Sequence, residues 1–408
     1  MTLDLPAIYR DLHANPELSF QEHRTAGIVA DALGGLGLAV TTGIAGTGVV
    51  GVLENGPGPT VLLRADMDGL PVLEETGLPY ASAVRGVDHE QHDVPVMHAC
   101  GHDVHVTCLL GATERLVAER ATWSGTLVAL FQPAEEWGGG AEAMIADRLY
   151  ERVPKPDVVL GQHVAPFPAG VLGVHAGPAM AGADSLTIRL HGTGGHGSRP
   201  ETTVDPVYLA ASTTVRLQGI VAREVASTDA AVVTVGKIHA GTKHNIIPSE
   251  ATLGLSVRSF DEVVRAKVLA SIERIARAEA AASAAPREPD FEYEERFPVT
   301  VNDVAATERT VAALRSTFGA DRVIDPGAVA GSEDVGVLAT AAGAPLVYWL
   351  LGGMEPSLFG DVLETGRMPE DVPSNHSPHF APIIEPTLEV GVAALVTAAR
   401  EWLAAPAG

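Results

Sequence analysis

The sequence predicts an α/β fold with a mixed, mostly parallel sheet flanked by helices, and three observations support this prediction. Short apolar runs bounded by glycine and proline alternate with stretches of helical periodicity before residue 180 and again after residue 302. Hydrophobic residues make up 46% of the chain and charged residues only 19%, as in globular proteins with large buried elements. With 408 residues the chain is too long for one ordinary core, so two domains are expected.

The elements of the first domain follow from these patterns. A helical stretch is expected over residues 4–36, broken at Asn15-Pro16 and closed by Gly34-Gly35. Buried strands and later helices follow from apolar runs and from helical spacing. The expected strands are 47–54, 60–65, 125–131, 158–162 and 346–351, and the later helices are 305–318 and 387–403.

The pattern changes near residues 179–182 and indicates an inserted α+β domain. Two strand–helix–strand halves of similar size predict a ferredoxin-like sandwich. We therefore expect a first domain in two parts, 1–180 and 293–408, interrupted by an insertion at 181–292. Within the insertion the expected strands are 184–191, 231–238, 250–258 and 291–299, and the expected helices are 204–225 and 261–282.

Composition also excludes several classes of partner. The net charge is −24 and basic clusters are absent, which argues against nucleic acid and against anionic membranes. Two cysteines, eight residues apart, make no disulfide framework. The N-terminus has neither a basic nor an apolar leader region, and no apolar run approaches the roughly 20 residues of a membrane span. A soluble, cytoplasmic protein is expected.

Several buried strands end in an acid or a histidine, and this recurrence points to one site. Acids follow strands 60–65 and 125–131, and a histidine follows strand 158–162. Because ligands in open α/β sheets bind beyond the carboxyl ends of the strands, these side chains are expected in one crevice. Singly, each is equally a turn, loop or surface residue. The residues expected to gather are Asp66, Asp68, Cys100, His102, Glu135, Glu136 and His163.

The stretch 96–105 holds one cysteine and three histidines. Cys100 and His102 are two residues apart, so they cannot share a helical face, but they can converge in a turn that leads into a helix. Such a helix is expected to follow, with Asp103 as its N-cap. A thiolate beside an imidazole favours a metal site. The alternative is a buried structural cysteine with solvated histidines.

Several sequence motifs of the chain resemble those of a known family. Eight strings, in the family's order and spanning nearly all of the chain, are similar to the M20 metallopeptidase family, in its aminoacylase and indoleacetyl-amino-acid hydrolase (hippurate hydrolase-like) branch. MHACGHD and FQPAEE are the most specific of them. The strings are LRADMDGLP (63–71), MHACGHDVH (97–105), FQPAEE (131–136), GQHV (161–164), GTGGHGSRP (192–200), HNIIP (244–248), GSED (331–334) and NHSPHF (375–380).

The resemblance implies a di-zinc peptidase-like fold with two divalent metal ions. It implies that Cys100 bridges the ions and that four further ligands complete the coordination. Thiolate and imidazole ligands suit Zn²⁺, and the carboxylate also admits Mn²⁺, Co²⁺ or Ni²⁺. Two such ions together polarise an amide carbonyl and lower the pKa of a shared water. The four further ligands are His102, Glu136, His163 and His376.

The resemblance also assigns roles around the metals. Glu135 is implied to be the general base that takes a proton from water and passes it to the leaving amine. Asp68 resembles the family acid that orients a ligand or Glu135. His379 lies close to His376, and the family's H-S-P spacing favours His376 as the ligand.

Four positions depart from the pattern of relatives. Asp66 stands where many relatives have a histidine, and Cys100 stands where they bridge with a carboxylate. His102 is expected to replace the lost histidine. Trp137 and Val335 are atypical within the branch and are expected to reshape the substrate pocket.

In the inserted domain the resemblance singles out three residues. His196 is implied to reach a neighbouring subunit's site and stabilise the tetrahedral oxyanion. Asn245 and Arg258 resemble residues that hold the substrate carboxylate, for which an arginine fork is suited. From the residues alone, these three read as a loop histidine, a turn asparagine and a surface ion-pair arginine. The resemblance makes this domain a lid and a dimerisation domain, so a homodimer, or a tetramer, is expected.

The implied activity is hydrolysis of the amide bond of an N-acyl amino acid, of N-acetyl, N-benzoyl or indoleacetyl type. The products are a carboxylic acid and a free amino acid. One alternative is a dipeptidase or aminopeptidase with the same two-metal site, whose substrate carries a free amine. A second is a homologue that binds a small ligand without catalysis.

Overall fold

The computed structural model describes residues 2–360, 369 and 371–405. The chain divides into two compact units: unit 1 is Met1–Gly177, Val301–Gly327 and Asp334–Gly408, and unit 2 is Pro178–Thr300 and Ala328–Glu333. The insertion expected at 181–292 lies inside unit 2, and its identity as a separate domain stays a prediction. Among the described residues, no helix combines the length and the apolar character needed to cross a bilayer.

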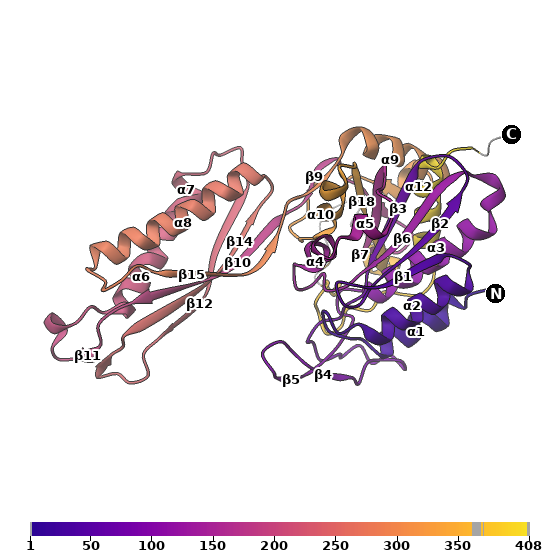
Figure 1. Cartoon of the computed structure of the whole chain (residues 1–408). Coiled ribbons are helices and arrows are strands. Elements are labelled where there is room, and N and C mark those ends of the chain that lie inside the picture. The colour runs from indigo at the N-terminus through magenta and orange to yellow at the C-terminus, as the bar shows by residue number, and fades with distance from the viewer. Residues whose placement is uncertain (1, 361–368, 370, 406–408) are drawn as a thin grey trace. The chain divides into compact units, whose positions relative to one another are not determined.

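Unit 1 is built on an eight-stranded sheet with the order β1-β2-β6-β3-β7-β18-β8-β17 (Figure 1). The central strands β6, β3, β7 and β18 are parallel to one another, whereas β1, β2 and β8 run antiparallel to their inner neighbours. The predicted mixed, mostly parallel sheet is confirmed. The strands are β1 (Ala39–Ile44), β2 (Gly48–Asn55), β3 (Thr60–Asp66), β6 (Gly125–Gln132), β7 (Val158–Pro168), β8 (Leu172–Gly173), β17 (Val323–Ile324) and β18 (Leu346–Met354).

Helices cover this sheet. Helix α3 packs on β3, α2 on β1 and β2, and α12 on α3 and α9, whereas α4 packs on β6 and against α10. Short strands β4 (Arg85–Val87) and β5 (Asp93–Pro95) form a hairpin outside the main sheet. The helices are α1 (Leu5–Ala14), α2 (His23–Gly35), α3 (His102–Ala118), α4 (Gly140–Ala146), α5 (Leu149–Arg152), α9 (Val304–Phe318), α10 (Val335–Ala342) and α12 (Thr387–Trp402).

Local sequence explains where these helices begin. The carboxylate of Asp4 accepts the N–H of Ala7 at 3.1 Å, so it caps α1, and Asp303 caps α9 by accepting the N–H of Ala306 at 2.8 Å. The predicted N-cap of α3, Asp103, is wrong. That helix begins at His102, two residues earlier than an Asp103 cap implies, and its N-cap is Gly101.

Glycine is required at position 101 for two reasons. Its φ is +82°, in the left-handed region that side chains with a Cβ disfavour. A Cβ built there would also lie 2.4 Å from Cγ1 of Val164. This close approach brings the first turn of α3 against Val164 in the middle of β7.

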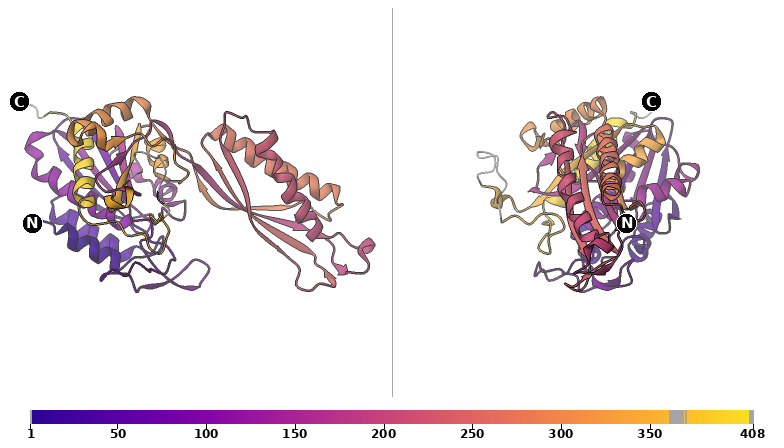
Figure 2. Two further views of the ribbon diagram at one scale, coloured as in Figure 1. Left: turned by 180° about the vertical axis from the view of Figure 1, so that it is seen from behind. Right: turned by 90° about the vertical axis from the view of Figure 1, so that its left-hand side faces the viewer.

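Unit 2 contains a four-stranded antiparallel sheet with the order β12-β14-β10-β15. In chain order the elements run strand, helices, two strands, helix, strand, which is the ferredoxin-like arrangement. Helices α6 and α8 pack together over one face (Figure 2). The elements are β10 (Gly182–His191), α6 (Pro206–Leu217), α7 (Gly219–Arg223), β12 (Ala231–Ala240), β14 (Glu250–Ser259), α8 (Glu262–Ala282) and β15 (Asp290–Phe297).

The single helix expected over 204–225 is wrong, because α6 and α7 are separate there. Gly219 begins the second helix, and glycine is a poor residue inside a helix. Strands β11 (Gly195–His196) and β13 (Ile246–Ile247) form a small separate pair. Two further strands, β9 (Gly177–Met180) and β16 (Thr300–Asn302), lie where the chain passes from one unit to the other.

Each unit has its own apolar core. In unit 1 the side chains of Val61, Leu62 and Leu63 are fully buried, so both faces of β3 are covered. In unit 2 Leu186, Ile188 and Leu190 alternate on β10 and point into the core beneath the helices. The candidate site lies where β3 and β6 end, beside the middle of β7.

Candidate metal centre

The parallel register of the central sheet of unit 1 brings the carboxyl ends of β3 and β6 beside the middle of β7. The strand end expected after residue 162 is wrong, because β7 continues to Pro168 and His163 lies within it. Asp66 at the end of β3 pairs in register with Gln132 at the end of β6, and Arg64 pairs with Gly161 of β7. The turn before α3 lies against β7 through Gly101. Among the described residues, five groups of histidine, cysteine and acidic side chains are close enough to hold a cation, two of them through Asp66 and His105 or through Glu333 and Asp334. The other three groups share six side chains, which we call the strand-end cluster: Cys100, His102, Glu135, Glu136, His163 and His376.

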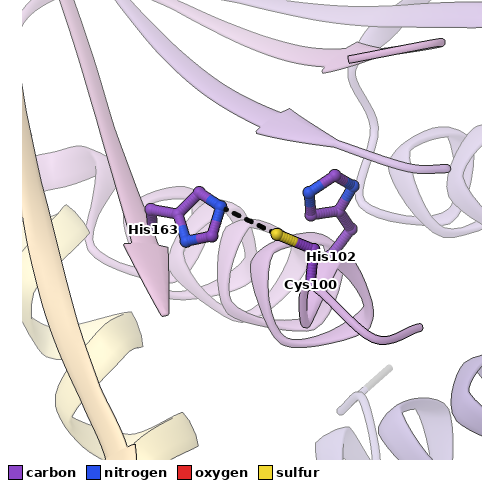
Figure 3. Close-up of side chains that lie close together, drawn as sticks. All are labelled: Cys100, His102 and His163. Atoms are coloured by element: carbon purple, nitrogen blue, oxygen red, sulfur yellow. Dashed lines mark hydrogen bonds between the residues drawn. The ribbon is translucent and has the colours of Figure 1, made fainter. Parts of the chain in front are cut away.

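The centre of the strand-end cluster is Cys100. Potential ligand atoms of Cys100, His102 and His163 lie within 4.8 Å of one another, and Sγ of Cys100 is 3.4 Å from Nε2 of His163. In Figure 3 the two imidazoles lie on either side of the sulfur, one carried by strand β7 and the other by the start of α3. This trio comes from segments more than 60 residues apart in the chain.

A second group shares the same sulfur. Cys100, Glu136 and His376 also have potential ligand atoms within 4.8 Å of one another, with Nε2 of His376 3.5 Å from Oε1 of Glu136. A third group joins His102 to Glu135 and Glu136. Cys100, His102 and Glu136 each belong to two of these three groups, so the cluster offers overlapping sets of ligand atoms.

The ring nitrogens of the cluster are oriented as ligands require. Nδ1 of His163 donates to the carbonyl oxygen of Val164 at 2.8 Å, which leaves the lone pair of Nε2 directed at the sulfur. Nδ1 of His102 lies 3.2 Å from Oδ1 of Asp68. A carboxylate behind the second nitrogen is the usual support of a metal-bound histidine.

Two buried polar atoms of the cluster lack a hydrogen-bond partner within the described part of the chain, as expected for atoms that bind a cation. Nε2 of His102 and Oε1 of Glu136 are buried and have no hydrogen-bond partner among the described residues. Such orphaned polar atoms are costly unless something binds them. A set of thiol, imidazole and carboxylate donors suits a divalent transition metal.

The electrostatic environment of the cluster also favours bound cations. Burial, together with the nearby Glu136 and Glu135, raises the pKa of the Cys100 thiol well above its usual range. Burial alone would lower the pKa of His102, but Asp66 and Asp68 raise it to about 10. An excess of acids around these groups calls for positive charge, which bound cations supply.

Asp68 supports the cluster from behind. Its Oδ1 accepts the N–H of Glu135 at 3.1 Å, and its Oδ2 accepts the N–H of Glu136 at 3.0 Å and the hydroxyl of Ser19 at 2.7 Å. With both oxygens in use and only 1% of its surface exposed, Asp68 is a support for the turn that carries the glutamates.

The neighbouring His105 lies near the cluster but is fully engaged elsewhere. Its Nε2 accepts the N–H of Val164 at 2.7 Å, so Nδ1 carries the proton and donates to Oδ1 of Asp66 at 2.5 Å. Asp66 also pairs with Arg64 at 2.7 Å. These contacts fix the part of β7 next to His163.

The structure separates the two histidines of the 375–380 string. His376 joins the strand-end cluster, whereas Nδ1 of His379 lies 3.0 Å from the carbonyl oxygen of Glu75. The φ of His376 is +69°, and its N–H donates to the carbonyl oxygen of Ala99 at 2.8 Å. A non-glycine residue in this conformation is held there by its surroundings.

His196, Asn245 and Arg258 lie in unit 2, apart in sequence from every cluster residue. His196 and Asn245 are exposed, and they come together because β11 pairs with β13 and Gly197 N–H donates to the carbonyl oxygen of Asn245 at 2.9 Å. Arg258 is half-buried and donates to the hydroxyl of Ser332.

Two positions flagged as atypical differ in their surroundings. Val335 is fully buried at the start of α10, so it belongs to the packing of unit 1. Trp137 is 45% exposed, and its ring centroid lies 4.1 Å from that of His89 in the β4–β5 hairpin. The effect of either residue on substrate choice stays a prediction.

Sequence reasoning missed several supporting residues. Glu22 accepts the N–H of Ala134, and Asn375 donates to the carbonyl oxygens of Cys100 and Val164. His13 lies between Asp103 and a glutamate, both in hydrogen-bond contact. One signal was available in Arg64, because a charged residue inside a buried apolar strand needs buried partners.

Comparison with known proteins decides the family. The model of peptidase family M20/M25/M40 matches residues 62–401. The chain belongs to this family. It is therefore a hydrolase that acts on amide bonds, and the resemblance drawn from its sequence motifs is confirmed.

Individual relatives show how the family varies. The chain is 41% identical over 318 residues to hippurate hydrolase of Campylobacter jejuni, covering 76% of this chain and 78% of the relative. It is 39% identical over 350 residues to thermostable carboxypeptidase 2 of Saccharolobus solfataricus, covering 85% and 84%. The crystal structure of YXEP from Bacillus subtilis, described as a dinuclear metal binding peptidase, has a TM-score of 0.75 at 28% identity and covers 98% of both chains.

Proposed function

We propose that this M20 hydrolase cleaves the amide bond of N-acyl amino acids, of N-acetyl, N-benzoyl or indoleacetyl type, to a carboxylic acid and a free amino acid. The single observation that carries the proposal is the strand-end cluster, in which a thiol, three imidazoles and two carboxylates gather. The similarity to hippurate hydrolase supports an acylated amino acid as the substrate.

In this proposal five residues hold two divalent cations, with Cys100 between them. The overlap of the ligand groups at Cys100 supports a shared thiolate, and the orphaned atoms of His102 and Glu136 support their roles as ligands. Zn²⁺ is the cation that this donor set suits best, and Mn²⁺, Co²⁺ and Ni²⁺ are the alternatives to compare with it. The five ligands are Cys100, His102, Glu136, His163 and His376.

Glu135 is the general base of the proposed reaction. When bound, the cations would polarise the amide carbonyl and lower the pKa of the attacking water. Glu135 accepts the proton of that water and later donates it to the nitrogen of the leaving amino acid. Its side chain is nearly buried, with Oε2 4.0 Å from Nε2 of His102, and Asp68 holds its backbone N–H. A fixed backbone keeps the carboxylate in place while the proton moves.

His196 is the proposed donor to the oxyanion. The N–H of Ser198 donates to Nδ1 of His196 at 3.1 Å, so in the neutral ring the proton lies on Nε2. That N–H is free to stabilise negative charge on the amide oxygen as it develops. Asn245 and Arg258 are proposed to bind the substrate carboxylate, by amide donation and by the guanidinium fork respectively.

The rival is a peptidase that uses the same cluster, and the similarity to a carboxypeptidase supports it. The two differ in whether the acyl side of the substrate carries a free amine. The test compares the metal-loaded enzyme on a panel of N-acetyl and N-benzoyl amino acids and on the matching dipeptides. Faster hydrolysis of the acylated compounds supports the proposal. Exclusive hydrolysis of dipeptides, or no hydrolysis of any acylated compound, refutes it.

A homodimer through unit 2 is part of the proposal. Strand β12 is an edge of its sheet and exposes Val232 and Ile238, and helix α6 exposes Tyr208 and Val215. An apolar edge strand of this kind is a template for pairing with a second copy. Light scattering at several concentrations should give twice the chain mass, and Val232→Lys should lower it. A mass of one chain for the unaltered protein refutes the dimer.

We also propose a cytoplasmic location. Both cysteines are free, and a ligand role requires Cys100 to stay reduced. Reducing compartments keep thiols in that state. Fractionation that recovers the protein outside the cytoplasm would refute this assignment.

A further inference from the structure

The turn that carries the two glutamates is held by two buried carboxylates. Three consecutive backbone N–H groups point at them: Ala134 donates to Oε1 of Glu22 at 2.8 Å, and the next two residues donate to Asp68 at 3.1 and 3.0 Å. Successive N–H groups that converge on anions form a nest, which fixes the backbone locally. Glu22 directly precedes helix α2 and Asp68 follows strand β3, so two separate segments of the chain hold the turn.

The turn would not keep its shape unaided. Ala134 has a φ of +52° and is fully buried, although a residue with a Cβ disfavours this region. Its carbonyl oxygen accepts the N–H of Gly140 at 3.1 Å, which closes the loop on the other side. A backbone conformation of this kind persists because neighbouring groups impose it. The bond from Ala134 to Glu22 is one of those constraints.

A carboxylate at position 22 is unfavourable for the stability of the fold. Its side chain is fully buried, and its hydrogen-bond donors are the hydroxyl of Thr47 at 2.5 Å and the N–H groups of Phe20 and Ala134. Among the described residues, no lysine, arginine or histidine forms an ion pair with it. Burial and the charge of Asp68 raise the pKa of Glu22 to about 7. Burying a carboxylate is unfavourable, so a buried carboxylate next to the turn that carries Glu135 and Glu136 indicates a functional role.

We propose that Glu22 is a positioning residue for the general base: through the N–H of Ala134 it holds the left-handed turn that aims the carboxylate of Glu135. The inference rests on the proposed function, in which Glu135 moves the proton. Glu22 touches none of the strand-end cluster side chains through a hydrogen bond. Its loss should therefore misplace the base while the cations stay bound.

The test uses three variants of the full chain. Glu22→Ala removes the acceptor, and Glu22→Gln keeps an oxygen for Ala134 while Thr47 turns to accept from the new amide. Glu17→Ala is the matched control, because Glu17 accepts the N–H groups of Arg24 and Thr25 at the start of α2 and makes no contact with the turn. For each variant we would measure kcat, KM, metal content, melting temperature, and hydrogen–deuterium exchange of a peptide covering residues 131–140.

We expect Glu22→Ala to change kcat and hydrogen–deuterium exchange but not KM or metal content. Glu22→Ala should lower kcat about 100-fold, the cost of a small misplacement of a reacting group, with KM and metal content unchanged. Its 131–140 peptide should exchange faster. Glu22→Gln should stay within about threefold of the unaltered enzyme in kcat, since the hydrogen bond to Ala134 is retained. Glu17→Ala should lower the melting temperature without lowering kcat.

Three results would overturn the inference. They are unchanged exchange of the 131–140 peptide in Glu22→Ala, loss of metal in parallel with loss of turnover, and a fall in Glu22→Gln as large as in Glu22→Ala. If the unaltered enzyme hydrolyses no N-acyl amino acid, the proposed substrate is wrong. The exchange experiment still decides the role of Glu22, because it needs no substrate.

Discussion

Apart from the exposed His376, the strand-end cluster of unit 1 is largely buried and is held by hydrogen bonds on several sides, whereas the β11–β13 pair of unit 2 exposes the histidine it carries. The side chains of His102 and Glu136 are 0% and 10% exposed, and Asp68 alone makes four hydrogen bonds around them. His196 is exposed, and its Nδ1 contacts the backbone N–H and the hydroxyl of Ser198. The fold of unit 1 preorganises the first region, whereas the proposed role of the second depends on the contact that His196 makes with the substrate during the reaction.

This contrast predicts that the two regions fail differently when altered. Changes in or behind the strand-end cluster should affect chemistry, metal content or stability. Changes in the β11–β13 pair should affect turnover alone. The predictions below test this division, beginning with the largest expected effect.

Replacing the proposed base should give the largest loss. Glu135→Gln keeps the size of the side chain but cannot accept the proton of water, so kcat should fall about 1,000-fold. Metal content should stay unchanged, because in our assignment Glu135 is not a ligand. Steady-state kinetics and elemental analysis on the same preparation check both statements. Turnover within tenfold of the unaltered enzyme would remove Glu135 from the mechanism.

Removing His13 should cost stability. The ring of His13 lies between Asp103 at 2.6 Å and Glu74 at 3.0 Å, with all three side chains buried. Loss of one member of a buried charged set leaves the others uncompensated, so His13→Ala should lower the free energy of unfolding by about 3 kcal/mol. Urea denaturation of the metal-free protein at pH 7 measures this. A change below about 1 kcal/mol, the range of exposed pairs, would show that the charges are not coupled.

The His13 contribution should also depend on pH. Burial alone would lower the pKa of His13, but its hydrogen bonds to Asp103 and Glu74 raise it from 6.5 to about 10. A raised histidine pKa stabilises the fold fully below pH 6.5, and this stabilisation is lost as the pH rises through 10. The difference in unfolding free energy between the unaltered protein and His13→Gln should therefore shrink from pH 7 to pH 10. A constant difference across that window would contradict a protonated His13.

On the exposed side, His196→Ala should lower kcat about 100-fold, the usual cost of one oxyanion donor. The melting temperature and the metal content should not change, because the side chain is exposed and lies outside the strand-end cluster. This result would sharpen the contrast with His13. A fall in melting temperature of several degrees would indicate a structural role for His196 instead.

The smallest effect is expected at Ser198. Its hydroxyl lies 2.8 Å from Nδ1 of His196, and its backbone N–H donates to the same atom. Ser198→Ala removes only the first contact, so kcat should fall about fivefold, the worth of one modest hydrogen bond. His196→Ala combined with Ser198→Ala should be no slower than His196→Ala alone. An additive loss would mean that Ser198 acts independently of His196.

The sequence predicted the sheet well because its strands are buried on both faces. Residues 60–65 and 125–131 are mostly apolar runs, followed by acids at position 66 and at positions 135 and 136, so both the strands and the polar edge beyond them could be predicted. By contrast Glu22 and His13 lie in a polar N-terminal stretch whose helical pattern does not reveal which charges turn inward. Their partners are 112 and 90 residues away, respectively, and only the folded chain brings them together.

Local rules also failed where tertiary packing decides. Asp103 has the residue type of an N-cap, yet its carboxylate is used by His13, and Gly101 takes the cap position because only glycine fits against Val164. The roles of His196, Asn245 and Arg258 were available only from the family resemblance, because periodicity predicts an element and its buried face but not the role of a polar side chain outside the core. Their roles stay predictions.

The central claim is that the strand-end cluster holds two cations around Cys100, and anomalous diffraction from crystals of the Zn²⁺- or Mn²⁺-loaded protein tests it most directly. The account predicts two strong peaks a few ångströms apart, each within about 2.3 Å of ligand atoms and both bonded to Sγ of Cys100. The remaining bonds should go to His102, Glu136, His163 and His376. Peaks located elsewhere, or a single peak that leaves Cys100 unbound, would contradict the account.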